Sequence, residues 1–93
     1  MKDFSHIIHT AKQTISLEAE SVALLQEYID ESFAEIVEHI LESKGRLVVA
    51  GVGKSAHIAA KIVATLNSTG TPSLFMHATE AIHGDLGMIQ KDD

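Results

Sequence analysis

A short apolar run that ends at a glycine turn constrains this chain most: Arg46–Ala50 is followed directly by Gly51–Gly53. Continuous apolar runs with β-branched residues are typical of strands buried on both faces of a parallel sheet. The residues that follow predict a helix over 54 to about 67 and a second strand over Ser73–His77. A strand–turn–helix–strand order predicts two parallel strands joined by a right-handed crossover.

Apolar spacing predicts the faces of the helices. In the crossover helix we expect a buried face made of Ile58, Ala59, Ile62, Val63 and Leu66. Ahead of the first strand, residues 5–28 and 33–41 are predicted to form two more helices, the second capped by Asp30 or Ser32. We therefore divide the chain into a helical segment, 1–44, and the first part of an α/β domain, 45–93.

Composition excludes several classes of protein. The 93 residues suffice for one small domain, and the net charge of -6 argues against a nucleic-acid-binding surface. The chain has no cysteine, no secretory signal and no apolar stretch long enough to span a membrane. We expect a cytoplasmic protein that binds neither membranes nor nucleic acid.

The turn Gly51–Gly53 and the following Lys54 and Ser55 indicate an anion site at a strand end. Glycines let a ligand approach the backbone, and a helix N-terminus presents free N–H groups. A nucleotide P-loop is excluded, because it would require glycine at position 48, where Val48 stands. The alternative for Lys54 is a solvated side chain, although a lysine there opposes the helix dipole.

A second polar cluster runs from His77 to Asp85 and contains His83. Histidines here could move protons or bind sugar hydroxyls, but one could equally pack while the other caps a turn. A metal held with Glu80 and Asp85 would require a spacing that matches no recognised ligand set. His57, one turn after Lys54, is interpreted as a helix-surface or subunit-contact residue.

Three stretches, Gly51–Ile58, Ser68–Ser73 and His77–Met88, resemble the bacterial arabinose-5-phosphate isomerases of the SIS sugar-isomerase superfamily. The third stretch is the most specific, and it departs from the family mainly at Ala78-Thr79, where Pro-Gly is common. The resemblance implies an α/β fold, a doubly wound parallel sheet of five strands in three α/β/α layers, assembled as a homotetramer. It also implies exchange of D-arabinose 5-phosphate with D-ribulose 5-phosphate, feeding Kdo for lipopolysaccharide or capsule, with no required cofactor.

The same resemblance assigns roles to individual residues. Lys54 matches the catalytic lysine, and His77 also matches the position of a zinc ion that inhibits. The residues matched to substrate contacts are Ser55, Gly70, Thr71, His77 and His83.

The resemblance also indicates what this chain lacks. The family's catalytic glutamates, its later histidine and its phosphate loop match no residue up to Asp93. Two strands make a poor sheet, so we expect a longer protein or strands borrowed from another copy. The 93 residues alone are expected to be inactive. The alternative functions are a SIS module that senses a sugar phosphate without converting it, and a self-associating structural protein.

Overall fold

The computed structural model describes all 93 residues, which form two compact units, Met1–Val37 and Glu38–Asp93. Before the first strand come α1 (Ser5–Leu24), the 3-10 turn η1 (Leu25–Tyr28) and α2 (Glu31–Glu42), and none of their residues is buried. Both predicted helices are confirmed. No helix has the combination of length and apolar character needed to cross a membrane. The predicted division at residues 44 and 45 stays a prediction.

Asp30 provides the cap of α2. Its Oδ1 accepts the backbone N–H groups of Ser32 at 3.0 Å and Phe33 at 3.3 Å, and the Ser32 hydroxyl at 2.6 Å. These hydrogen bonds stabilise the carboxylate and lower the pKa of Asp30, and the bond from the Ser32 hydroxyl contributes most. Of the two predicted caps, the structure selects Asp30.

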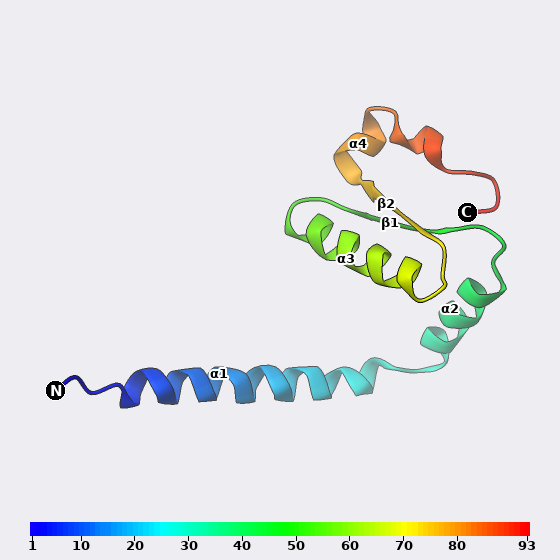
Figure 1. Ribbon diagram of the computed structural model, residues 1–93. Coiled ribbons are helices and arrows are strands. Elements are labelled where there is room, and N and C mark those ends of the chain that lie inside the picture. Colours follow the sequence, from blue (N-terminus) through cyan, green and yellow to red (C-terminus); the bar gives the residue numbers. More distant parts are fainter. The chain divides into compact units, whose positions relative to one another are not determined.

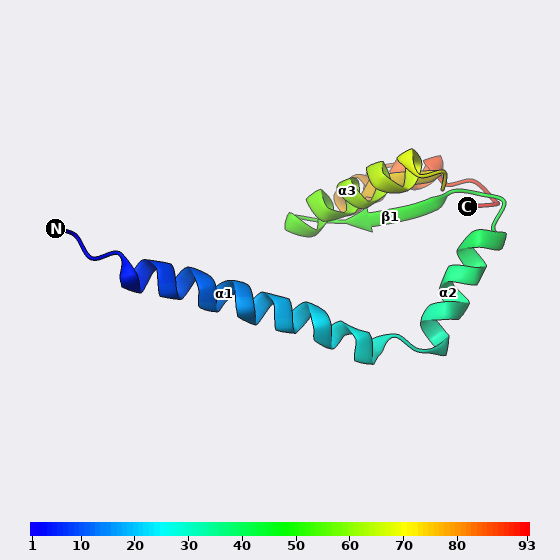
Figure 2. The same ribbon diagram turned by 60° about the horizontal axis from the view of Figure 1, so that its bottom comes forward.

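The second unit begins within α2 and continues as a strand–helix–strand crossover, a short helix and a 3-10 turn. It contains β1 (Leu47–Gly51), α3 (Lys54–Ser68), β2 (Ser73–His77), α4 (Ala78–Ile82) and the 3-10 turn η2 (Asp85–Met88). The strands pair in parallel, from Leu47 with Ser73 to Gly51 with His77. Helix α3 lies along one face of this sheet, as Figure 1 and the turned view in Figure 2 both show. The predicted parallel crossover is confirmed.

Most of residues 84–87 belong to η2, in which the Gly87 N–H donates to the Gly84 carbonyl at 3.0 Å. The prediction for the first strand needs correction. The first strand was expected to be buried on both faces, yet its residues are half-buried or exposed. A helix packed on one face of a two-stranded sheet covers that face only.

The core lies between α3 and the sheet. Ala56, Ala59 and Val63 of α3 are buried, as is Met76 of β2. Ala56, Ala59 and Val63 form one narrow stripe along α3, and a two-stranded sheet is wide enough to cover only such a stripe. Ile58 and Ile62 lie off this stripe and are 63% and 45% exposed, so the prediction that they are buried is wrong for this chain.

Polar contacts hold the turn between α3 and β2. Asn67 accepts the backbone N–H of buried Ser73 at 2.7 Å and donates to its carbonyl at 3.2 Å. The Ser73 hydroxyl donates to the Thr71 carbonyl at 3.0 Å, and Gly70, directly before Thr71, has a φ of 99°. The turn that carries Gly70 and Thr71 is therefore tied to the amino end of β2.

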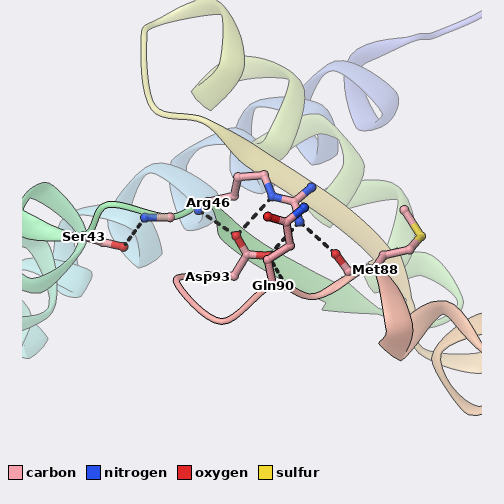
Figure 3. A network of polar contacts seen from close by, with 6 residues as sticks. Ser43, Arg46, Met88, Gln90 and Asp93 are labelled. Carbon is pink, nitrogen blue, oxygen red and sulfur yellow. Dashed lines mark hydrogen bonds and ion pairs between the residues drawn. The ribbon is translucent and has the colours of Figure 1, made fainter.

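Arg46 and Asp93 form a network that the sequence pattern did not indicate (Figure 3). The guanidinium donates to both carboxylate oxygens, at 3.1 Å and 2.7 Å, and to the Met88 carbonyl at 2.9 Å. Asp93 also accepts the backbone N–H groups of Arg46 and Gln90, each at 2.9 Å. The hydrogen bonds to Asp93, of which those from the Arg46 side chain contribute most, hold the pKa of its carboxyl well below its usual range. This network fastens the segment after η2 to the start of β1.

Candidate functional site

The carboxyl ends of both strands lie at one edge of the sheet, because Gly51 is paired with His77. Helix α3 begins three residues after Gly51, and α4 begins directly after His77. Open parallel sheets bind their ligands outside this edge. The crossover therefore brings the predicted site residues Lys54, Ser55 and His77 to the edge where a ligand is expected.

The start of α3 has the features of an anion site. Gly53 precedes the helix with φ 61° and ψ -134°, a conformation that favours glycine. No side chain caps this terminus, and its first turn has no acidic residue. The first N–H groups of a helix have no partner within the helix, and the helix dipole favours a negative charge beside them. Lys54 adds a cation at the same place.

A hollow of about 500 Å³ opens between α3 and β2 at this edge. Lys54 and His57 line it from the helix, and Phe75 and His77 line it from the strand. The lining is completed by small residues, Gly53, Ala56 and Ala60. The structure thus brings Lys54 and His77 together, as predicted from their positions at the strand ends.

The backbone holds His77 in one orientation. Its Nδ1 accepts the N–H of Thr79 at 3.2 Å and so caps α4. The ring of Phe75 meets it edge to face, with 6.5 Å between ring centroids. An imidazole that accepts at Nδ1 carries its proton on Nε2 when neutral. His77 therefore caps α4 with Nδ1, which was one of the two alternatives for this residue, and its contact with substrate stays a prediction.

Other predicted residues lie outside the hollow. Ser55 is exposed on the first turn of α3, and His83 is exposed at the end of α4. Gly70 and Thr71 line a different hollow, with Arg46 and Pro72, beyond the amino end of β2. The two hollows lie toward opposite ends of β2, since Thr71 precedes His77 by six residues, roughly 20 Å of extended chain at about 3.3 Å each. A substrate held between Lys54 and His77 therefore lies far from Gly70 and Thr71 of the same chain.

His57 also lines the hollow with Lys54. It is exposed, which agrees with the expected position on the helix surface, and the expected subunit contact stays a prediction. The signal was present in the spacing, since residues three apart share a helix face.

The residues of this chain do not make a metal site by themselves. Nowhere do three His, Cys, Asp or Glu side chains converge as a metal would require. Zinc sites have three or four protein ligands, so a zinc ion on His77 would require ligands from outside these residues. The inhibitory zinc stays a prediction.

Comparison with known proteins defines the class. The family model described as "SIS domain" matches residues 39–93, which include the whole strand–helix–strand crossover and its carboxyl edge. The chain belongs to the SIS domain family.

Within this family the chain is similar to arabinose 5-phosphate isomerases. It is 55% identical over 86 residues to the isomerase KdsD of Pseudomonas aeruginosa, covering 92% of this chain and 26% of that protein. It is 46% identical over 87 residues to the isomerase GutQ of Escherichia coli K12, covering 94% and 27%. The chain thus spans about a quarter of the length of these relatives.

A solved structure supports the fold. The E. coli CFT073 protein c3406, in complex with arabinose 5-phosphate, superposes with a TM-score of 0.90 at 42% identity. The match covers 99% of this chain and 49% of that one. The predicted α/β class is confirmed, and the chain corresponds to about half of that SIS fold.

Proposed function

We propose that the protein carrying this chain is an aldose–ketose isomerase that interconverts D-arabinose 5-phosphate and D-ribulose 5-phosphate. One observation carries the proposal: Lys54 stands at the uncapped start of α3 and lines a hollow with His77. The names of the relatives, and the arabinose 5-phosphate bound in the similar structure, support the substrate.

The chemistry requires a proton to move between C1 and C2. A base removes the C2 proton of the aldose while the C1 carbonyl oxygen takes up a proton, which gives an enediol. The O2 hydroxyl then loses its proton, C1 gains one, and the ketose results. Negative charge develops on oxygen along this path, and donors placed to meet it lower the barrier. Lys54 supplies the ammonium for that charge, and His77 supplies an N–H donor at Nε2.

The catalytic base is proposed to come from outside the set of residues that line the hollow in this chain. Its lining contains no carboxylate and no residue besides Lys54, His57 and His77 with a titratable side chain. His77 already accepts a hydrogen bond at Nδ1, so its neutral ring has no free acceptor nitrogen. The catalytic glutamates implied by the resemblance match no residue of this chain, so we expect the carboxylate base in residues beyond it, and no turnover by the 93 residues alone.

The positions of Gly70 and Thr71 bear on the assembly. They lie at the opposite end of β2 from Lys54. If they contact substrate, they do so at the site of a second copy. Such a shared site would require a homo-oligomer; we propose a homotetramer, which a mass measurement by light scattering would check.

The proposal extends to pathway and regulation. The interconversion serves synthesis of Kdo for lipopolysaccharide or capsule, in the cytoplasm. No cofactor is required, and a zinc ion held at His77 with ligands from outside this chain inhibits. Turnover with and without a chelator tests the zinc, and higher activity after chelation is expected.

The decisive experiment compares two lysines of α3 in the full-length protein. Lys54→Gln should lower kcat for arabinose 5-phosphate by about 10²- to 10³-fold, the usual cost of one oxyanion donor. Lys61→Gln, an exposed lysine of the same helix that does not line the hollow, is the matched control and should retain turnover. An active Lys54→Gln enzyme would remove Lys54 from the mechanism. Tight binding of the sugar phosphate without turnover by the unmodified protein would favour the sensor function.

A further inference from the structure

His57 is the one nitrogen-bearing side chain of the hollow to which no role has been assigned. It follows Lys54 by three residues on α3, so the two side chains share a helix face. The rise between them is about 4.5 Å, at about 1.5 Å per residue. A molecule as long as a pentose phosphate can therefore contact both.

The surroundings of His57 leave its ring free for a ligand. It takes part in none of the chain's side-chain hydrogen bonds, whereas His77 is engaged by Thr79. Its neighbours in the lining, Ala56 and Ala60, are small and carry no polar side-chain atoms. An oxygen of a ligand in this hollow finds side-chain N–H donors only on Lys54, His57 and His77.

Resting on the proposed function, we infer that His57 binds the sugar phosphate directly, donating a hydrogen bond to a substrate oxygen away from the reacting C1 and C2 atoms. Lys54 serves the reacting end, and His57 holds the rest of the molecule one helical turn further along α3. A contact made equally in the ground state and the transition state acts on KM rather than on kcat.

The kinetic test uses the full-length protein and three variants. His57→Ala should raise KM for arabinose 5-phosphate about tenfold and leave kcat within about twofold, as for loss of one hydrogen bond. His57→Asn keeps an N–H donor and should recover part of the affinity. His9→Ala, on exposed α1, is the matched control and should change neither constant. An unchanged KM in His57→Ala overturns the inference.

A spectroscopic test keeps the result clear if His57→Ala fails to fold. The histidine ring resonances are recorded in the unmodified full-length protein, and that of His57 is identified from its absence in His57→Asn. Addition of arabinose 5-phosphate should shift the His57 resonance and leave that of His9 in place. A silent His57 resonance at saturating substrate overturns the inference.

The two tests separate this inference from the proposed function. Turnover by the unmodified protein with an unaffected His57 would uphold the isomerase and overturn the contact. A shifted His57 resonance without any turnover would uphold the contact and overturn the isomerase.

Discussion

Replacing Lys54 with glutamine should stabilise the ligand-free protein while it removes activity. Lys54 is the first residue of α3, whose terminus has neither a capping side chain nor an acidic residue. That terminus carries about half a positive charge, and an adjacent like charge costs about 0.3–1 kcal/mol at low ionic strength. Glutamine and lysine have similar helix propensity, so the electrostatic difference dominates. We expect the free energy of unfolding to rise by this amount.

Urea unfolding in phosphate-free buffer measures this gain. Raising the salt concentration shortens the screening length from about 10 Å at 0.1 M to about 3 Å at 1 M, so the gain should shrink at high salt. Lys61→Gln, two turns further into α3 and equally exposed, should change stability by less than about 0.5 kcal/mol. Adding arabinose 5-phosphate should reverse the order, because the ligand stabilises the unmodified protein more than the variant.

Two results would refute this reasoning. If Lys54→Gln lowers the free energy of unfolding without ligand, Lys54 is not in conflict with the helix dipole. If Lys61→Gln produces the same gain, the effect concerns net charge rather than the helix terminus. In either case the position of Lys54 would need no ligand to explain it.

Two further predictions concern the frame around the site. A Cβ added at Gly51 would lie 3.0 Å from the Ser55 carbonyl oxygen and 3.1 Å from the Ala56 nitrogen, so Gly51→Ala should lower the free energy of unfolding in urea by about 1–3 kcal/mol. A Cβ added at Gly87 would have nothing within 4 Å, so Gly87→Ala is the control and should cost less than about 0.5 kcal/mol. Equal costs for the two variants would contradict the close approach at Gly51. Arg46 lowers the pKa of Asp93 in the folded protein, so the stabilisation is complete above the usual value of 3.8 and is lost as pH falls below it. The difference in melting temperature between the unmodified protein and Asp93→Asn should therefore shrink below that pH, and a constant difference would contradict the pairing.

Much of the fold followed from local patterns. The apolar run at β1, the glycine turn and the apolar spacing of α3 are each encoded within a few residues, and the structure confirms these elements. The predicted burial of Ile58 and Ile62 failed because apolar spacing marks a face without saying how much sheet lies opposite it. The Arg46–Asp93 network escaped prediction because its partners are 47 residues apart.

The candidate site, like the fold, could be predicted from the sequence only in part. Lys54 and His77 were placed at one edge from sequence, since parallel strands end together. Gly70 and Thr71 were grouped with them by resemblance, and their distance along β2 became evident only from the structure. The position of His57 in a hollow became evident only from the structure, because Phe75 and His77 of β2 form the opposite wall.

By itself, the sequence determined the order of strand, glycine turn, helix and strand, and it predicted an anion site at the first turn of α3. Backbone conformation and helix dipoles are local properties, so a few residues suffice to specify them. Only the tertiary structure decided which side chains share the hollow at the carboxyl edge, and which lie an entire strand away from it. Such proximity depends on the packing of α3 against β2, which joins residues that are distant in the chain.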